Sequence, residues 1–235
     1  MFKNQSVLAI IPARGGSSRV VGKNKRIVGG LPLISWTIRA CFGCSHIDEV
    51  ILSTDDRVIE DIARSEGVKR IHTRAPHLAS GTSPTIDTVV AIISELEQEE
   101  MHFEWILLAQ PTSPLRSTDH LYSAFNLLDQ HFPASIVSVT SSDHPREWSG
   151  HLDPDGDMTG FIKETRLELS SAQLPPTYVI NGAIYLAPSA SIVKENTFFS
   201  KRRLFAYFMR PEDSIDIDTE FDLQIANFLL SEKLP

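Results

Sequence analysis

Residues 7–25, VLAIIPARGGSSRVVGKNK, decide the fold class, because an apolar run ends here in a loop of proline, glycine and basic residues. A continuous apolar run such as Val7–Ile11, followed by Pro and Gly, is typical of a buried strand that leads into a loop. Glycines let backbone N–H groups approach phosphate oxygens closely, and Arg14 and Lys23 can add charge-assisted hydrogen bonds. The loop of residues 12–30 is therefore predicted to bind phosphate groups, with a flexible surface turn as the alternative.

Two common phosphate-binding motifs do not fit this loop. A Walker A motif would need glycine where Ser17 stands, and Ser or Thr where Asn24 follows Lys23. The G-x-G-x-x-G motif fails because Ser17 comes directly after Gly15 and Gly16. Neither motif therefore supports phosphate binding here, and the prediction depends on the glycines and basic residues of the loop alone.

The composition indicates one globular domain over residues 1–235. The chain is 42% hydrophobic and 22% charged, which is enough to bury one sizeable core. Its longest apolar runs are about five residues, whereas a membrane span needs about twenty, and no secretory signal pattern is present. We therefore expect a cytoplasmic protein that does not enter a membrane. A net charge of −8 also disfavours a general nucleic-acid binder.

Charge is unevenly distributed along the chain. The first acidic residue is Asp48, and seven basic residues precede it. They are Lys3, Arg14, Arg19, Lys23, Lys25, Arg26 and Arg39. A local positive region in an acidic protein predicts a site for a small anion, with a solvated basic face as the alternative. The two cysteines, Cys41 and Cys44, lack partners for a zinc site and are interpreted as small apolar residues.

Short apolar runs alternate with longer helical patterns. Strands are predicted at residues 7–11, 49–53, 69–72, 105–109, 136–140, 181–186 and 205–209, and helices at 32–41, 57–66, 84–97, 118–130 and 219–230. The last helix is predicted to bury Phe221, Ile225, Phe228 and Leu229. This order indicates an α/β fold with a mostly parallel twisted sheet and helices on both faces. Ligands then bind at the carboxyl ends of the strands.

A polar stretch interrupts the pattern from residue 141 to about 176–180. It contains His144-Pro145 and Pro175-Pro176, and the sequence DPDG at 153–156 predicts a β-hairpin. We interpret the stretch as an insertion and not as a second core.

Polar loops follow two other predicted strands. QPTSPLR comes directly after WILLA, so Gln110, Thr112, Ser113 and Arg116 are expected to contact a ligand, unless the loop merely caps the next helix. Asp55 and Asp56 are better explained as caps of the following helix. Residues 74–85 contribute Arg74, Ser80, Thr82, Ser83 and Thr85.

The stretch SIDIDT at 214–219 is a candidate metal site. In an extended chain, period-two alternation sends Asp216 and Asp218 to one face and the isoleucines to the other. Two neighbouring carboxylates favour Mg²⁺, which keeps waters and phosphate oxygens in its shell. The alternative is acidic capping of the last helix, which explains Asp218 but not Asp216.

Taken together, IIPARGGS…GKN, QPTSPLR, QLPPTYVINGAIY and DSIDIDTEFDL resemble the acylneuraminate cytidylyltransferase family, also called CMP-sialic acid synthetases. The resemblance extends from about Val7 to Leu230. It implies a nucleotidyltransferase (Rossmann-like) fold. It also implies a reaction in which the anomeric hydroxyl of a nine-carbon 2-keto-3-deoxy sugar acid attacks the α-phosphorus of CTP. The products are CMP-sugar and pyrophosphate.

The resemblance also implies roles for residues at matching positions. It assigns nucleotide and phosphate binding to Arg14, Gly16, Ser17, Lys23 and Asn24, and contacts near the base and ribose to Arg74 and Thr85. It assigns the sugar pocket to Gln110, Asn181, Tyr185, Phe198 and Phe199. Asp216 and Asp218 would hold Mg²⁺, and with Arg14 and Lys23 they form the catalytic set. The polar insertion corresponds to the dimerisation element, which implies a homodimer.

Departures from the family pattern leave the substrate open. The family usually has Lys after GGS, where this chain has Ser18 followed by Arg19. Basic residues common before Q-x-L-P and N-G-A-I-Y are replaced by Ser170, Ser171 and Val179, and we hypothesise that Arg146 and Arg166 substitute for them. The sugar acid is then sialic, legionaminic or pseudaminic acid. GTP, an eight-carbon sugar acid or a non-catalytic nucleotide-binding module are the rival interpretations.

Overall fold

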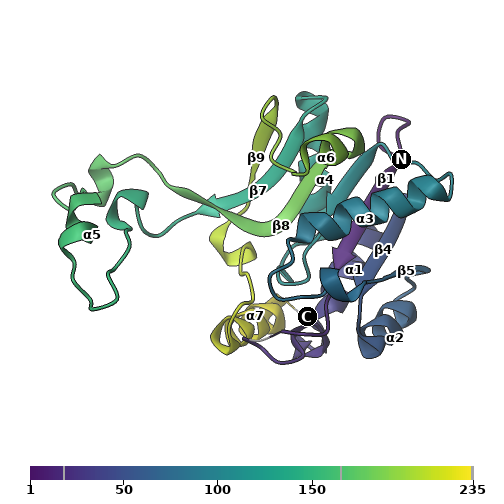
Figure 1. Cartoon of the computed structure of the whole chain (residues 1–235), viewed down its shortest axis with the longest axis horizontal. Helices are drawn as coiled ribbons and strands as arrows, with labels where there is room; N and C mark the ends of the chain where they lie inside the picture. The colour runs from purple at the N-terminus through teal and green to yellow at the C-terminus, as the bar shows by residue number, and fades with distance from the viewer. Residues whose placement is uncertain (18, 165, 234–235) are drawn as a thin grey trace.

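The computed structural model describes residues 1–17, 19–164 and 166–233, and its centre is a seven-stranded sheet (Figure 1). The strand order is β5-β4-β1-β6-β8-β7-β9. The strands are β1 (Val7–Pro12), β4 (Glu49–Thr54), β5 (Arg70–Thr73), β6 (Trp105–Leu108), β7 (Ser135–Ser141), β8 (Tyr178–Pro188) and β9 (Leu204–Phe208). Only β8 runs antiparallel to its neighbours, β6 and β7. The predicted mostly parallel sheet is confirmed.

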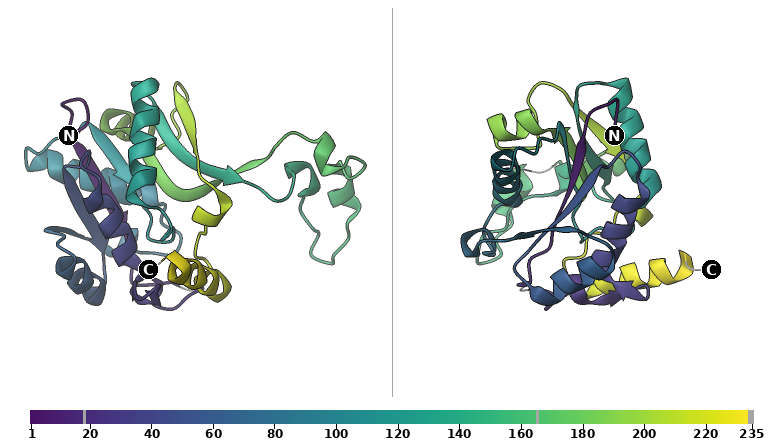
Figure 2. Two further views of the ribbon diagram at one scale, coloured as in Figure 1. Left: turned by 180° about the vertical axis from the view of Figure 1, so that it is seen from behind. Right: turned by 90° about the vertical axis from the view of Figure 1, so that its right-hand side faces the viewer.

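Helices cover both faces of the sheet (Figure 2): α1 (Leu33–Gly43), α2 (Arg57–Ser65) and α4 (Thr118–Gln130) on one face, and α3 (Thr85–Gln98) and α6 (Ser189–Glu195) on the other. Two further helices, α5 (Thr159–Glu164) and α7 (Glu220–Lys233), lie away from the faces of the sheet. Alternation along β1 explains the two layers, because successive strand side chains point to opposite faces. Ala9 and Ile11 pack in the core under α1, α2 and α4, whereas Leu8 and Ile10 pack in the core under α3 and α6.

A third cluster joins the loop after β1 to the C-terminal helix. The loop includes a small hairpin of β2 (Ile27–Val28) and β3 (Leu31–Pro32). The cluster consists of Val20, Val28, Leu33, Leu115, Ile217, Leu223, Ala226 and Leu230. Gly29 has a φ of 55°, and a Cβ there would lie 2.6 Å from Leu230 Cβ. This close approach requires glycine and holds the loop against α7.

The face of α7 that packs on this loop differs from the predicted one. Phe221 and Phe228 are 68% and 62% exposed, while Leu223, Ala226 and Leu230 are buried. The helix carries apolar side chains on two sides, and the side with Leu223, Ala226 and Leu230 packs against the opening loop. The short helix α6, with Ile192 buried, was not predicted either.

Residues between β7 and β8 form an arm that projects away from the body (Figures 1 and 2). The predicted DPDG turn is present, since the Gly156 N–H donates to the Asp153 carbonyl at 2.8 Å. The predicted hairpin is wrong, because the described residues on either side of the turn form no strand. Instead the Asp157 carboxylate accepts from Thr159 N at 2.8 Å and Thr159 Oγ1 at 2.7 Å, which favours the start of α5.

Both cysteines are buried free thiols. Burial raises the pKa of Cys41 to about 11 and also raises the pKa of Cys44. A protonated buried thiol is unreactive, in agreement with the interpretation of both residues as apolar packing. Within the described ranges, no helix has the length and hydropathy needed to cross a membrane.

Candidate active site

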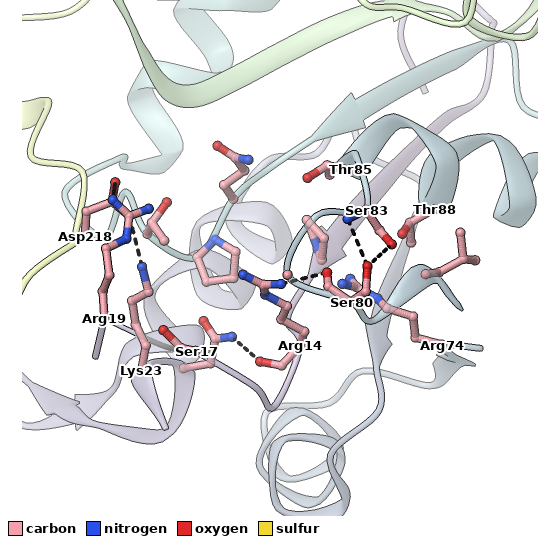
Figure 3. Close-up of a pocket in the computed structure, with 17 residues that line it drawn as sticks. Arg14, Ser17, Arg19, Lys23, Arg74, Ser80, Ser83, Thr85, Thr88 and Asp218 are labelled. Atoms are coloured by element: carbon pink, nitrogen blue, oxygen red, sulfur yellow. Dashed lines mark hydrogen bonds and ion pairs between the residues drawn. The ribbon is translucent and has the colours of Figure 1, made fainter. Parts of the chain in front are cut away.

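A pocket of about 390 Å³ opens at the carboxyl ends of β1 and β6 (Figure 3). Its walls come from the loop after β1, the segment from Arg74 to Thr88, the loop after β6 and the segment before α7. The predicted site residues that line it are Arg14, Ser17, Lys23, Asn24, Arg74, Thr85, Gln110 and Asp218. The tertiary structure thus brings residues more than 200 positions apart into one cavity.

Arg19 reaches the pocket beside Lys23, at the position to which the departure at Ser18 is expected to move the phosphate contact. Gly81 and Thr88 line the opposite end of the pocket and were not singled out from the sequence as site residues. Thr88 is 1% exposed and lies one helical turn after Thr85 on α3. A polar residue at i+3 on the buried side of a helix was the signal that could have identified it. Ser18 lies outside the described residues.

Hydrogen bonds fix the glycine-rich loop. The Asn24 side chain donates to the Arg14 carbonyl at 3.0 Å, and the Arg14 guanidinium donates to the Ser80 carbonyl at 2.8 Å. The Gly15 N–H donates to Asp55 Oδ1 at 2.7 Å. A Cβ on Gly15 would come within 2.8 Å of Asp56, so this position requires glycine. The loop is therefore anchored to β4 and to the segment after β5.

Asp56 caps α2, as predicted. Its Oδ1 accepts from Val58 N at 2.8 Å and Ile59 N at 3.1 Å, and its Oδ2 pairs with Lys25 at 2.8 Å. The pKa of Asp56 is lowered in spite of its partial burial, because Lys25 and the helix N–H groups favour the charged form. Asp56 thereby connects the opening loop to α2.

The acidic segment before α7 meets the basic loop. Asp218 Oδ2 lies 3.0 Å from Arg19 Nη1, and Asp218 Oδ1 lies 3.3 Å from Lys23 Nζ. Lys23 also donates to the Ile217 carbonyl. Ile217 is fully buried between the two aspartates, as the alternating pattern predicts. The two aspartates thus belong to the pocket and its immediate surroundings.

Asp218 does not cap α7. The cap is made by Thr219 and Asp222: Asp222 N donates to Thr219 Oγ1 at 3.2 Å, and Thr219 N donates to Asp222 Oδ2 at 2.7 Å. The capping interpretation of Asp218 is therefore wrong, because a better-placed pair performs that role. Asp216 is exposed on one side, but partial desolvation by the surrounding residues raises its pKa, against an opposing hydrogen bond from Thr112, and the nearby Asp218 charge raises it further. Such repulsion between carboxylates is what a bound cation relieves.

Aromatic residues predicted to form the sugar pocket lie together beside this segment. The Tyr185 ring centroid is 5.8 Å from that of Phe198 and 6.1 Å from that of Phe199. The pKa of Tyr185 is raised by burial and by the charge of Asp216. These three rings and Asp216 are therefore neighbours, next to the pocket that contains Gln110.

Asn181 lies in a buried network and not on the pocket surface. It is 3% exposed; its Oδ1 accepts from Ser138 Oγ at 2.6 Å, and its Nδ2 donates to Ser214 Oγ at 2.9 Å. The next residue, Gly182, has a φ of 75°, and a Cβ there would lie 2.8 Å from Gln110 Oε1. Asn181 thus connects β8 to the segment that carries Asp216 and Asp218.

Two residues of the loop after β6 are structural, contrary to the prediction that they contact a ligand. Arg116 is 1% exposed and donates to the carbonyls of Gln110 and Ala183, both at 3.0 Å. Ser113 is fully buried and donates to the Asn181 carbonyl at 3.3 Å. These side chains point inward, where they donate to buried carbonyls, whereas Gln110 and Thr112 line the pocket.

The architecture is that of a nucleotidyltransferase. A CMP:2-keto-3-deoxy-manno-octonic acid synthetase solved with CTP matches with a TM-score of 0.72 at 14% identity, over 97% of this chain and 100% of that one. The 4-diphosphocytidyl-2C-methyl-D-erythritol synthase of Anaerococcus prevotii matches with a TM-score of 0.61 at 18% identity, over 96% and 98% of the two chains. At such identities the likeness shows the fold.

Sequence comparison shows the family. Residues 8–150 match the cytidylyltransferase family model, and this chain belongs to that family. The chain is 34% identical over 228 residues to the CMP-N,N′-diacetyllegionaminic acid synthase of Legionella pneumophila, covering 97% of this chain and 95% of the relative. The resemblance to acylneuraminate cytidylyltransferases is confirmed, and the protein is a nucleotidyltransferase of the cytidylyltransferase type.

Two other relatives act on different sugar acids by name. An N-acylneuraminate cytidylyltransferase of Streptococcus agalactiae is 32% identical over 92% of this chain, which spans only 51% of that relative. A pseudaminic acid cytidylyltransferase of Campylobacter jejuni is 29% identical, over 94% of this chain and 95% of the relative. Relatives of similar identity thus carry names of three different sugar acids.

Proposed function

We propose that this cytidylyltransferase transfers CMP from CTP to the anomeric hydroxyl of a nine-carbon 2-keto-3-deoxy sugar acid and releases pyrophosphate. The observation that carries the proposal is a single pocket in which Arg19 and Lys23 pair with Asp218 and which Arg14, Arg74 and Gln110 also line. Such a pocket offers cationic groups to a triphosphate at one place and a separate wall to a sugar acid. The names of the relatives support both substrates.

The protein contributes positioning and charge neutralisation. In-line attack on the α-phosphorus needs an oriented hydroxyl, a leaving pyrophosphate and cations around the equatorial oxygens. Arg14, Lys23 and the loop residues Gly16, Ser17 and Asn24 would bind the phosphates, and Lys23 and Arg19 would stabilise the charge that develops. Arg74 and Thr85 would hold the base and ribose. No side-chain nucleophile is required.

Asp216 and Asp218 would hold Mg²⁺. The donor set fits this ion, because both ligands are carboxylates, and desolvation together with the charge of Asp218 raises the pKa of Asp216. Within the described part of the chain, no three His, Cys, Asp or Glu side chains form a metal cluster, so phosphate oxygens and water would complete the shell. When bound, Mg²⁺ would neutralise charge on the phosphate oxygens.

The sugar acid would bind between Gln110 and the cluster of Tyr185, Phe198 and Phe199. Legionaminic, pseudaminic and sialic acids share the carboxylate and the anomeric hydroxyl and differ in their substituents. The higher identity to the Legionella pneumophila relative favours a legionaminic-type acid. Asn181 would support this wall indirectly, through the segment that it anchors.

The arm would form a homodimer interface. Several apolar side chains on the arm and on the strand ends next to it are exposed, which leaves a large apolar surface uncovered. They are Leu152, Met158, Ile162, Leu167, Tyr178, Val179, Ile180 and Phe208. Light scattering of the purified protein should give the mass of a dimer, and the double substitution Val179→Glu with Ile180→Glu should shift it to that of a monomer. A wild-type monomer would contradict the interface.

Pyrophosphate release tests the function. The assay combines Mg²⁺, each of the four NTPs and a panel of N-acetylneuraminic, legionaminic, pseudaminic and eight-carbon 3-deoxy sugar acids. Release with CTP and one nine-carbon acid supports the proposal and names the substrate. Release only with GTP, or only with the eight-carbon acid, would overturn the corresponding half of the proposal. Arg146→Ala and Arg166→Ala variants then test these residues, because an unchanged KM for the sugar acid would remove them from its site.

A further inference from the structure

Arg74 is a buried cation at the wall of the pocket. The residue is 8% exposed, it lines the cavity, and among the described residues it forms no ion pair. Burial lowers the pKa of Arg74 because the guanidinium is poorly solvated there, and the nearby Asp55 charge offsets this only in part. Such a group needs both a ligand and a support that holds its long side chain in one rotamer.

Ser53, at the end of β4, supplies this support. Arg74 Nε donates to Ser53 Oγ at 3.2 Å, and Arg74 Nη2 donates to the Ser53 carbonyl at 3.1 Å. The same carbonyl accepts from Ala13 N at 2.8 Å, at the base of the phosphate-binding loop. Ser53 is fully buried, so the position of these two acceptor atoms does not depend on surface side chains. The remaining terminal nitrogen of Arg74, Nη1, has no partner among the described residues and is left for a ligand.

His72 sets the direction of the Ser53 hydroxyl. The two residues are register partners in the parallel pair β4 and β5, and Ser53 Oγ lies 2.8 Å from His72 Nδ1. His72 Nε2 lies 3.4 Å from Glu95 Oε1 on α3, which favours a proton on Nε2 and leaves Nδ1 as an acceptor. Ser53 then gives its only proton to His72, and its lone pairs are available to Arg74 Nε.

We propose that Ser53 and His72 are positioning residues for the nucleotide, acting through Arg74. They do not touch the substrate; they hold the guanidinium with one nitrogen toward the pocket before CTP binds. The inference rests on the proposed placement of the base and ribose beside Arg74. Figure 3 shows Arg74 with Ser80, Thr85 and Thr88 at one end of the pocket, and Lys23 with Asp218 at the other. Loss of the support should therefore weaken nucleotide binding and leave the chemical step nearly unchanged.

Steady-state kinetics with CTP and the sugar acid that turns over test this proposal. Ser53→Ala removes the acceptor of Arg74 Nε, and the KM for CTP is expected to rise about tenfold, the equivalent of one lost hydrogen bond to a charged group. The kcat and the KM for the sugar acid should stay within about twofold, since the lost binding is equal in ground and transition states. Ser135→Ala, which alters another buried serine on β7 outside the pocket, is the matched control.

Two substitutions of His72 provide a test that does not depend on Ser53→Ala folding. His72→Leu removes the acceptor and should reproduce the rise in KM for CTP. His72→Asn places an amide oxygen near the position of Nδ1 and should restore most of the wild-type KM. Equal KM values in these two variants would overturn the role of His72. Calorimetric titration of CTP without sugar acid should follow the same order.

The double variant Ser53→Ala with Arg74→Ala separates positioning from a general structural effect. If Ser53 acts through Arg74, the double variant binds CTP no more weakly than Arg74→Ala alone. Additive losses would overturn the inference. An unchanged KM for CTP in Arg74→Ala would instead overturn the proposed placement of the nucleotide. A raised KM in Arg74→Ala with an unchanged KM in Ser53→Ala would overturn the positioning role alone.

Discussion

Lys23 Nζ lies 3.3 Å from Asp218 Oδ1, although the two residues are separated by 195 positions in the chain. Arg19 holds the other oxygen of the same carboxylate at 3.0 Å. In this arrangement, the two cations proposed to bind the triphosphate are paired with the carboxylate proposed to bind Mg²⁺. Each ligand therefore has to displace the same ion pairs, so binding of one should favour binding of the other.

Asp218→Asn should separate catalysis from nucleotide binding. We expect kcat to fall at least about a hundredfold, because charge stabilisation of the transition state depends on this carboxylate. Binding of CTP without metal should become about two- to fivefold tighter, since Arg19 and Lys23 are released from partly exposed ion pairs. Calorimetry in EDTA measures the second effect. Asp61→Asn, on the exposed side of α2, is the control. Weaker metal-free binding in Asp218→Asn would contradict the pairing argument.

Asn181→Ala should act on the acidic segment. The substitution removes one hydrogen bond from each of Ser138 and Ser214 and should lower the free energy of unfolding by about 1–3 kcal/mol. Because Ser214 precedes Asp216 by two residues, we expect the Mg²⁺ concentration for half-maximal activity to rise several-fold. Titration of activity with Mg²⁺ checks this. A change confined to the KM for the sugar acid would instead favour the direct sugar contact predicted from the sequence.

Gly182→Ala tests the contact between β8 and the loop after β6. The φ of 75° costs a residue with a side chain about 1–2 kcal/mol, and the added Cβ would lie 2.8 Å from Gln110 Oε1. We expect a lower unfolding midpoint together with a raised KM for the sugar acid. Gly156→Ala, at a φ of 84° in the arm with no atom within 4 Å, provides the matched control. It should show the backbone cost without the change in KM.

The stability of the protein should depend on His72 below neutral pH. Its pKa is lowered first by burial and then by the Arg74 charge, against an opposing effect of Glu95. A lowered folded-state pKa means that the unfolded chain takes up the proton first. The stabilising contribution is therefore complete above about 6.5, the ordinary histidine pKa, and is lost as pH falls through the folded pKa. Denaturant unfolding at pH 7 and pH 5.5 should show a larger loss in wild type than in His72→Asn. An equal loss would contradict the argument.

Local patterns predicted most of the fold. These patterns are short-range features, because strand and helix periodicity depends on residues that are close in sequence. They include the apolar runs at Val7–Ile11 and 105–109, the helical spacing at 84–97 and the helix cap at Asp56. The hairpin at DPDG was wrong because a turn can lead into a helix as well as a strand. The face of α7 was wrong because two apolar stripes on one helix are equivalent until a partner surface selects one.

The site was predictable as a set of loops but not as a set of contacts. The carboxyl-edge rule for parallel sheets located the glycine-rich basic loop, and alternation predicted that Ile217 is buried between Asp216 and Asp218. Whether a polar side chain faces the pocket or the interior depends on which buried carbonyls need a donor. Arg116 and Ser113 turn inward for that reason, and Asn181 satisfies Ser138 and Ser214.

By itself the sequence determined the α/β class, the order of most strands and helices, the polar insertion and the glycine-rich basic loop, because these depend on periodicity and local backbone preference. Only the tertiary structure decided that Arg19 and Lys23 share Asp218, that Ser53 and His72 support Arg74, and that Thr219 and Asp222 cap α7. Those relationships join residues from different elements, or choose between nearby candidates. Hydrogen-bond distance and burial decide them, and neither is encoded in the spacing of residues along the chain.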